Sequence, residues 1–374
     1  MRLWVEYAWQ QVAHPDDGHP DAVSTFQTER LFCAILVGGF VPPAGGMDAK
    51  RIASDLAELV ARGQTPEEVL PVVRSLLPQD FHVPVSLLRV EEGWRAELLE
   101  CDAPPLFLVR GRHLVLLPVV EEEADGHLLR RCSFRLQAGD RLAMVSEGFI
   151  RARGWGRRWS WQEVALALKR LADGGGGVEE WLGALVRTYL RLSEGWPERK
   201  ATVLAMYVRP VRTLTVWSGP PADPGRDEEA LTKLMAETGW RAICGDTTAQ
   251  IAARLLGKDL RVETRPADGW MEVPPTSALG GVDLVTEGLV TMRIARRRLQ
   301  EAHRLRDLPR QTDGATRLAC LLWQADIVRF LVGLAVNPAQ AADVAGKTPL
   351  RRIVVEELAE ELRRKGKIVS VEYL

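Results

Sequence analysis

The sequence predicts an α+β protein in which antiparallel β-sheets come first and a smaller α/β domain follows. Short apolar segments joined by tight turns fill most of the first 217 residues, which is the pattern of antiparallel sheets. A stretch rich in Pro, Gly and Asp, residues 218–229, indicates a domain boundary. Beyond it, apolar strands alternate with helices, as in a parallel or mixed sheet with helices packed on it. We therefore expect two domains, 1–217 and 218–374.

Capping signals define the helices expected in the first domain. Asp48 precedes an amphipathic segment and Gly63 follows it, so the segment between them is predicted to be helical. A capping box at Thr65 opens the next helix, and another at Ser160 opens a third. The expected helices are 48–63, 65–78, 160–173 and 178–192.

Apolar runs that end in turn residues define the strands. A polar stretch, the polar excursion, separates the expected strand 113–118 from the one that begins at residue 132. Four glycines, Gly174 to Gly177, follow a helix rather than a strand, which favours a flexible connection over a phosphate-binding loop. The expected strands are 1–10, 31–40, 84–90, 94–101, 104–110, 113–118, 132–136, 141–146, 201–208 and 213–217.

The second domain alternates strands with helices. The basic run 293–306 is interpreted as a solvated helix face, with docking of a partner as the alternative. The expected strands are 241–245, 281–288, 325–333 and 367–374, and the expected helices include 246–257, 289–305 and 349–366.

Composition excludes several classes of protein. The 374 residues are 46% hydrophobic and 26% charged, as in an ordinary globular protein, and the net charge of −1 gives no reason to expect nucleic acid or an anionic membrane as partner. No apolar run approaches the roughly 20 residues that span a bilayer, and residues 1–10 lack the apolar core of a signal peptide. The cysteines form no CxxC pair, so we expect reduced, buried thiols and a cytoplasmic location. They are Cys33, Cys101, Cys132, Cys244 and Cys320.

Two segments carry a resemblance to a known family. AGDRLAMVSEGFIRA (138–152) and CDAPPLFLVRGRHLVLLP (101–118) resemble the bacterial phosphatases typified by stage II sporulation protein E, of the metal-dependent PPM class of serine/threonine phosphatases. The anchors are Pro104-Pro105, Gly139-Asp140-Arg141 and the acid-Gly step that follows. The resemblance covers about residues 1–210, and the tail resembles the extension carried by some members.

The resemblance implies a sandwich of two antiparallel sheets flanked by helices. In the family, aspartates at strand ends hold two Mg²⁺ or Mn²⁺ ions between the sheets, and these activate a water that attacks phosphoserine or phosphothreonine. Hard divalent cations need several anionic oxygens, so the family's activity depends on the aspartates that bind the metal ions.

Each metal-binding position of the family has a counterpart here. An early aspartate corresponds to Asp21, but the Asp-Gly pair of the next strand falls on Gly38-Gly39, where the acid is missing. The later Asp-Gly pair falls on Glu147-Gly148, an acid one methylene longer. The two aspartates before the last strand correspond to Arg199 and Lys200, which are cations.

These replacements add about five positive charges relative to the family, against the four that two divalent ions bring. We therefore expect no metal or cofactor, with Arg199 and Lys200 paired to Asp21 and Glu147; if an ion binds, it is Mn²⁺ or Mg²⁺ on the two acids. Asp48 is another acid that could be a metal ligand, although its place directly before a helix favours a role as N-cap. The loop HPDDGHPD offers further donors and is interpreted as a solvated turn. Those donors are His14, Asp16, Asp17 and His19.

A second set of site residues lies in the C-terminal domain. Gly245, Asp246, Thr247 and Thr248 stand where a strand meets a helix, and Glu287 stands at a similar corner. If the two strands are neighbours, both corners share the carboxyl edge of one sheet, where open α/β folds bind ligands. The alternative is an ordinary Thr/Asp helix cap.

The sequence thus predicts a cytoplasmic bacterial signalling protein of PPM fold that has lost its metal centre: a pseudophosphatase that binds a phosphoprotein or a regulatory protein. One alternative is an active Mn²⁺- or Mg²⁺-dependent protein phosphatase. Another makes the C-terminal α/β domain the working part, as the sensor of a small molecule.

Overall fold

The computed structural model describes residues 2–12, 20–40, 47–76, 83–150, 153–154, 157–193, 200–236, 238–263, 273–310, 312–335 and 350–374. The chain forms two compact units, Met1–Pro210 and Val211–Leu374, and each is described by itself. Within the described ranges, no helix is long and apolar enough to cross a membrane.

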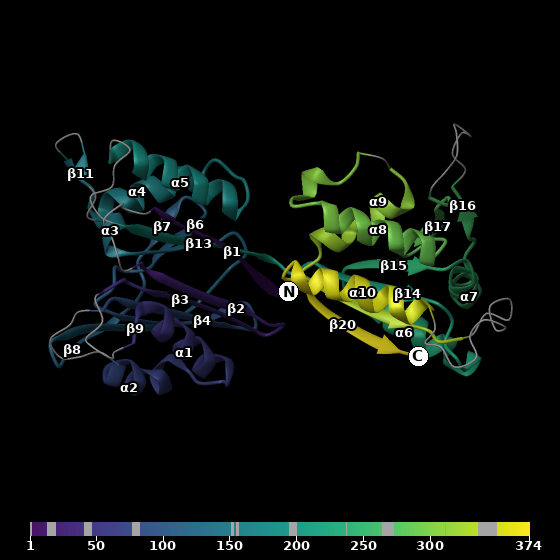
Figure 1. Ribbon diagram of the computed structural model, residues 1–374, viewed down its shortest axis with the longest axis horizontal. Coiled ribbons are helices and arrows are strands. Elements are labelled where there is room, and N and C mark those ends of the chain that lie inside the picture. The colour runs from purple at the N-terminus through teal and green to yellow at the C-terminus, as the bar shows by residue number, and fades with distance from the viewer. Residues whose placement is uncertain are drawn as a thin grey trace. The chain divides into compact units, whose positions relative to one another are not determined.

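Two antiparallel sheets form the centre of the first unit (Figure 1). The six-stranded sheet has the order β2 (Ala22–Gln27), β3 (Leu31–Val37), β4 (Val85–Glu91), β5 (Arg95–Cys101), β9 (His127–Arg135), β8 (Val120–Ala124). The five-stranded sheet has the order β1 (Leu3–Val12), β13 (Ala201–Pro210), β10 (Arg141–Val145), β6 (Phe107–Arg110), β7 (His113–Val115). A small separate ribbon pairs β11 (Arg153–Gly154) with β12 (Arg157–Arg158).

The two-residue period of the strands divides their apolar side chains between two faces. In β3, Phe32, Ala34 and Leu36 belong to the core between the two sheets. Its intervening residues, such as Ile35, belong instead to the core beneath the helices that cover the six-stranded sheet. Strands of this kind are buried on both faces, which explains why 31–40 has a continuous apolar run.

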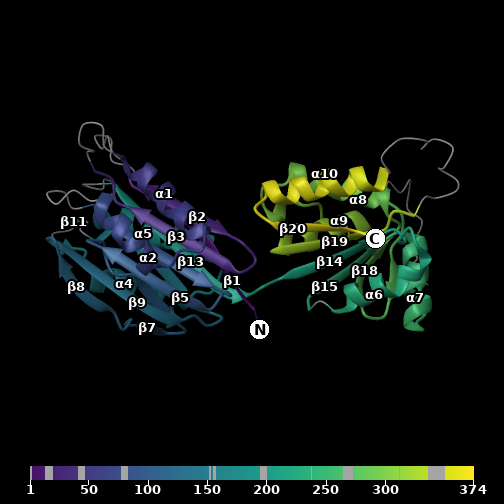
Figure 2. The ribbon, with the colours of Figure 1, turned by 90° about the horizontal axis from the view of Figure 1, so that it is seen from below.

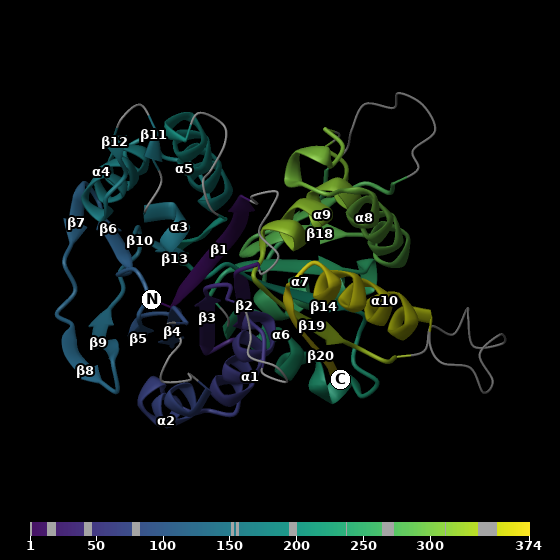
Figure 3. The same cartoon turned by 60° about the vertical axis from the view of Figure 1, so that its left-hand side comes forward.

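Helices cover the outer faces of both sheets, so the unit has four layers (Figure 3). The helices α1 (Ala49–Ala61) and α2 (Pro66–Leu76) lie on the six-stranded sheet, while α3 (Glu147–Ile150), α4 (Trp161–Ala172) and α5 (Val178–Leu192) lie on the five-stranded sheet. The predicted caps are confirmed: Asp48 accepts a hydrogen bond from the Arg51 N–H at 2.8 Å, and the box at Ser160 is present. The sandwich of antiparallel sheets flanked by helices is confirmed.

The polar excursion before residue 132 is a β-hairpin that the sequence did not predict. Strand β8 forms the edge of the six-stranded sheet and pairs with β9, which begins at His127. Its charged residues pair with neighbouring elements: Glu122 contacts Arg131 of β9 at 3.2 Å and Arg74 of α2, a helix that covers this sheet, at 3.2 Å. A charged edge strand resists pairing with another chain, so it lacks the apolar alternation by which strands are usually predicted.

The second unit is built on a seven-stranded mixed sheet. Its order is β16 (Arg261–Val262), β17 (Ser277–Leu279), β18 (Val282–Thr286), β15 (Trp240–Cys244), β14 (Thr213–Ser218), β19 (Ile327–Val332), β20 (Ile368–Tyr373). The five strands from β18 to β20 are parallel, whereas β16 and β17 pair antiparallel at one edge. The predicted mixed sheet with helices is confirmed, although it is larger than expected.

Helices cover both faces of this sheet (Figure 2). On one face lie α8 (Leu289–Glu301), α9 (Gly314–Gln324) and α10 (Leu350–Arg364), and on the other lie α6 (Asp227–Ala236) and α7 (Asp246–Leu256). Two short 3₁₀ turns, η1 (Pro224–Arg226) and η2 (Leu305–Asp307), complete the described elements.

The boundary between the units differs from the prediction of 1–217 and 218–374. The division falls after Pro210, because β14 is a central strand of the second sheet, with β15 on one side and β19 on the other. The Pro/Gly/Asp stretch that suggested the later boundary is instead the loop from β14 to η1. A connection inside a domain can carry the same turn residues as a linker between domains.

Candidate functional site

Asp21 and Gly38-Gly39 meet at one end of the six-stranded sheet. Ala22 in β2 pairs with Val37 in β3, so the residues just outside these strands are neighbours. The Oδ1 atom of Asp21 accepts a hydrogen bond from the Gly39 N–H at 2.8 Å. Its Oδ2 atom is buried without a hydrogen-bond partner among the residues that the structure describes. The alignment that the resemblance implied therefore brings these positions together.

Glu147 and Lys200 lie at one end of the five-stranded sheet. The Ser146 N–H donates to the Thr202 carbonyl at 2.9 Å, and the Thr202 N–H donates to Ser146 Oγ at 2.8 Å. Glu147 therefore begins α3 directly after this pairing, and Lys200 stands directly before β13. Arg199 lies outside the described residues.

A glutamine side chain links the two sheet ends. Gln11 Nε2, at the end of β1, donates to Thr202 Oγ1 at 3.2 Å and to the Asp21 carbonyl at 3.4 Å. Asp21 and the Ser146–Thr202 pairing therefore share one contact network, and Glu147 and Lys200 stand beside it in the chain. The predicted positions 21, 38, 39, 147, 148 and 200 thus gather at the same end of the sandwich.

Position 38 leaves little room for a side chain. A Cβ atom at Gly38 would lie 3.0 Å from Cδ of Pro84 and 3.1 Å from its Cγ. The Gly38 N–H also donates to the Pro84 carbonyl at 2.8 Å, which holds the two residues together. The ring of Pro84 therefore stands against the place from which an aspartate side chain would start.

Aromatic packing holds the backbone that follows Glu147. Phe149, fully buried, stacks on Tyr189 with ring centroids 4.6 Å apart, and Trp159 packs against both. The Tyr189 hydroxyl donates to the Gly148 carbonyl at 3.4 Å. This packing fixes the backbone of α3 and hence the position of Glu147.

The anchor Gly139-Asp140-Arg141 has a structural role. Asp140 is fully buried and accepts two hydrogen bonds from Arg110, at 2.8 and 2.7 Å, and one from the Gln137 N–H. Arg141 lies over the ring of Tyr207 and donates to the Gly176 carbonyl at 2.8 Å. These contacts join β6, β10 and the Gly-rich connection, which is confirmed as a helix–helix link.

Two buried polar groups in the first unit were not predicted from the sequence. Burial raises the pKa of Glu100 to about 7, although Arg130 and the Leu106 N–H bond to its carboxylate and oppose the shift. Beside Glu100, the side-chain atoms of Cys101, Asp102 and His127 that could coordinate a metal lie within 4.8 Å of one another. The Asp102 carboxylate contacts His127 Nδ1 at 2.6 Å and accepts from the Leu128 N–H, which ties β5 to β9.

The remaining donors predicted in the first unit fall into three groups. Asp48 is an N-cap, as preferred. The loop donors His14, Asp16, Asp17 and His19 lie outside the described residues. All five cysteines are free thiols, and burial raises the pKa of Cys33, Cys101 and Cys132 to about 12 and that of Cys244 to about 11. Cys33, Cys101 and Cys244 are buried as predicted, whereas Cys132 and Cys320 are half-buried. The raised pKa values agree with inert thiols.

The two predicted corners of the C-terminal unit are neighbours. Cys244 pairs with Thr286 across parallel strands, and a Cβ at Gly288 would lie 3.3 Å from the Gly245 Cα. The backbone N–H groups expected to be exposed at this corner are partly used: that of Gly245 donates to Thr286 and that of Asp246 to Glu287. Asp246 and Thr247 are exposed, whereas Thr248 is buried.

Glu287 already occupies the N-terminus of α8. Burial raises the pKa of Glu287, the charge of Asp246 raises it further, and the N–H groups of Val290 and Thr291 bond to its carboxylate and oppose the shift. The anion that the helix N-terminus favours is therefore supplied by the chain itself. With Asp246 beside it, this corner repels a further anion.

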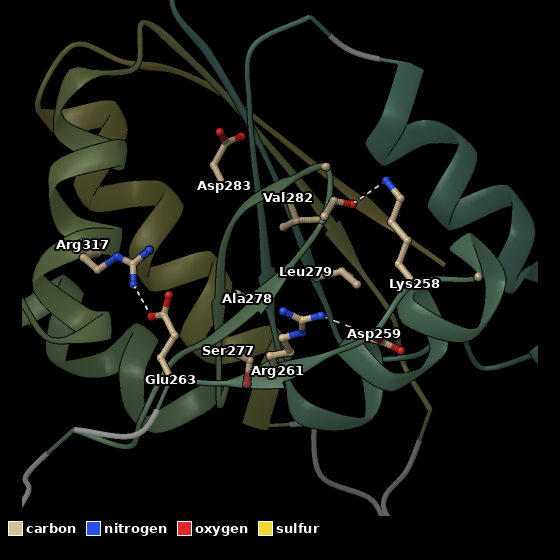
Figure 4. A pocket seen from close by; sticks show the side chains of 13 residues that line it. Lys258, Asp259, Arg261, Glu263, Ser277, Ala278, Leu279, Val282, Asp283 and Arg317 are labelled. Carbon is tan, nitrogen blue, oxygen red and sulfur yellow. Dashed lines mark hydrogen bonds and ion pairs between the residues drawn. The ribbon is translucent and has the colours of Figure 1, made fainter. Parts of the chain in front are cut away.

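A shallow cavity of about 690 Å³ lies beside the antiparallel edge of the second sheet (Figure 4). Its charged groups bond to one another or to the backbone: Arg317 pairs with Glu263 at 2.8 Å, and Lys258 donates to the Gly280 carbonyl at 2.9 Å. Asp283 accepts from the Arg241 N–H at 2.8 Å. The cavity contains none of the predicted cradle residues, and its charges are already compensated.

No protein-family model and no curated protein matches this sequence. Several solved structures are similar to part of it, and they are PP2C-type phosphatase domains. The phosphatase domain of SpoIIE from Bacillus subtilis is 17% identical over 56% of this chain and 93% of its own, with a TM-score of 0.44. The RsbU and RsbW domains of a Mycobacterium tuberculosis protein are 16% identical over 62% and 67%, with a TM-score of 0.45. The PP2C domain of SiaA from Pseudomonas aeruginosa is 17% identical over 53% and 84%, at 0.41.

In the first unit, two antiparallel sheets are covered by helices on both outer faces. This is the arrangement that the resemblance of residues 1–210 implied.

Proposed function

We propose that this protein is a pseudophosphatase: a PPM-fold protein that has lost its two-metal centre and regulates by binding a phosphoprotein or a regulatory protein. The observation that carries the proposal is the packing of Pro84 against Gly38, which crowds a position where the family has a metal-binding aspartate.

The donor set supports the same conclusion. The Oδ1 atom of Asp21 already accepts a hydrogen bond from the Gly39 N–H. Glu147 is the other acid at the matched positions. With Lys200, these side chains carry two negative charges and one positive charge, a sum of −1, and Arg199 would bring it to zero. Two divalent ions bring +4 and need several anionic oxygens, so these residues do not fit the family's metal pair.

We also infer a cytoplasmic location, because five free thiols are typical of a reducing compartment. The binding partner would meet the sandwich at the end where Lys200 lies. Lys200, with Arg199 beside it in the sequence, suits a phosphate group that is held without being cleaved.

A phosphatase assay tests the proposal against the alternative of an active enzyme. The parent and Glu147→Ala are incubated with millimolar Mn²⁺ and either p-nitrophenyl phosphate or a phosphoserine peptide. We expect the parent to be no faster than the variant. Mn²⁺-dependent turnover that Glu147→Ala abolishes would establish the active enzyme instead.

The second alternative, a sensor module in the C-terminal unit, has one observation in its favour. The parallel strands have the order β18-β15-β14-β19-β20, so the sheet is wound in both directions from β14. Sheets of this kind bind ligands where the winding reverses.

A further inference from the structure

The winding of the second sheet reverses between β14 and β19. The chain leaves β14 for β15 and β18 on one side, and later returns to β19 and β20 on the other. The segments that follow the two strands stay paired: the Gly333 N–H donates to the Ser218 carbonyl at 3.0 Å, and the Ala335 N–H to the Pro220 carbonyl at 3.1 Å. This reversal point is the place at which an open α/β sheet takes a ligand.

The guanidinium of Arg351, near the start of α10, lies on this point. It donates from Nη1 to the Gly333 carbonyl, directly after β19, at 3.0 Å. Gly219, directly after β14, has a φ of +82°, and a Cβ there would lie 2.3 Å from Arg351 Cζ. The glycine therefore leaves room for the guanidinium, which bridges the ends of the two strands.

Arg351 has no acidic partner in the part of the chain that the structure describes. The contact to Gly333 uses one of its five N–H donors. Burial lowers the pKa of Arg351. The position of Arg351 in the helix makes its positive charge still less favourable. A cation is unfavourable at a helix N-terminus, and the first turn of α10 holds no acid to offset it.

A buried hydroxyl faces the same space. Leu214 and Val216 of β14 share a core with Val354 of α10, so every second residue of β14 points to that face. Ser218 continues the series, at the carboxyl end where α10 begins. It is fully buried, and its Oγ has no hydrogen-bond partner among the described residues. A buried hydroxyl without a partner is costly, which indicates that something absent from the chain satisfies it.

The neighbouring corner has the opposite charge. Glu287 caps α8 and stands near Asp246, so an anion is repelled there. Along one sheet edge, the Arg351 corner is therefore the one suited to an anion.

We propose that Arg351, Ser218 and the N-terminus of α10 form a binding site for a small oxyanion ligand, a phosphate monoester or a carboxylate. The guanidinium binds the charged oxygens, the Ser218 hydroxyl donates a hydrogen bond, and the helix N-terminus favours the negative charge. This site is independent of the pseudophosphatase proposal, because it uses no residue of the first unit.

Thermal unfolding of the full chain, with inorganic phosphate or acetate as probes, tests the site. Chloride at equal ionic strength serves as the reference. We expect one probe to raise the melting temperature of the parent, with a stabilisation that grows with its concentration. The better probe shows whether the ligand is a phosphate or a carboxylate.

The test variant is Arg351→Met, and the control is Arg352→Met, the adjacent arginine that lies over the ring of Tyr373. Arg351→Met should weaken binding of the probe about tenfold or more and be at least as stable as the parent in chloride, since it removes a desolvated cation. Arg352→Met should keep the response to the probe. Ser218→Ala should weaken binding without lowering stability in chloride.

Three results would each overturn the site. They are a parent that responds to neither probe beyond chloride, an Arg351→Met variant that keeps the response, and an Arg351→Met variant that is less stable than the parent in chloride. The last would mean that the bond to Gly333 is the whole role of Arg351.

Discussion

At the scale of the residue, the proposal of a lost metal centre depends most on Pro84. An aspartate replaced by glycine leaves a space that a carboxylate could refill. Here a Cβ at position 38 would lie 3.0 Å from the Pro84 ring, so the ring must give by a few tenths of an ångström to admit it. Under the proposal, the site has changed in packing as well as in charge.

The first prediction concerns this packing. Gly38→Asp should destabilise the protein by about 1–3 kcal/mol, because the new side chain must displace the Pro84 ring. Combining it with Pro84→Ala should recover part of the loss, as a double-mutant cycle by urea unfolding would show. A Gly38→Asp variant as stable as the parent, with no coupling to position 84, would show that Pro84 does not crowd position 38.

The second prediction concerns the pH dependence at Glu287. Its pKa is raised in the folded state, so stability falls as pH rises from the ordinary value of a glutamate through the folded value. The variant Glu287→Gln removes this loss and can still accept the two N–H bonds. Its melting temperature should exceed that of the parent at pH 7, and the difference should shrink toward pH 4.

The control for this experiment is Glu229→Gln in α6. The pKa of Glu229 is lowered to about 2 by bonds from Arg226 and Lys233, so its charge favours folding above the ordinary pKa. Its substitution should change the melting temperature in the opposite direction at pH 7, by a small amount at this exposed site. If Glu287→Gln instead tracked the control, the raised pKa would be wrong.

At the scale of the element, the chain crosses from one sheet to the other after β5, and a buried ion pair holds the crossing. Glu100 accepts from the Leu106 N–H at 2.7 Å, at the start of the segment that leads to β6. Arg130 of β9 donates to Glu100 at 3.0 Å and also to the Ala103 carbonyl. One pair thus connects the six-stranded sheet to the segment that leads to the five-stranded sheet.

The third prediction follows from this pair. Glu100→Ala should cost about 3–5 kcal/mol of unfolding free energy, because it leaves Arg130 buried without its acid. Glu122→Ala, in the exposed hairpin strand β8, breaks two surface pairs and should cost less than about 1 kcal/mol. Equal losses in the two variants, measured by urea unfolding, would contradict the role given to Glu100.

At the scale of the whole molecule, the two units divide after Pro210, although turn residues suggest a division after residue 217. The reason is strand pairing: β14 bonds to β15 and β19 in the second sheet. Removing β14 would split that sheet at its centre and expose cores on both of its faces.

The fourth prediction tests this division. A fragment of residues 211–374 should unfold cooperatively on its own, whereas a fragment of residues 218–374 should not fold. Circular dichroism and thermal unfolding of both fragments, with 1–210 as the matched partner, provide the measurement. Cooperative unfolding of 218–374 at the same temperature as 211–374 would place the boundary later in the chain.

Local signals in the sequence were enough to predict most of the helices, most of the strands and the class of fold. The helices α3 and α6 were not predicted. Caps such as Asp48 and Ser160, and the two-residue alternation of apolar side chains, are local signals that act within a few residues. The resemblance also placed Asp21, Gly38 and Gly39 at one site, because matched positions in similar folds share strand ends.

Only the tertiary structure decided which strands are neighbours. The sequence of β14 does not say whether it pairs with β13 or with β19, and a charged strand such as β8 carries no apolar alternation. The same holds for Pro84 against Gly38, and for Arg351 over Gly219, which lie 46 and 132 positions apart in the chain. Pairing and packing depend on contacts between distant segments, and those contacts form only when the whole chain folds.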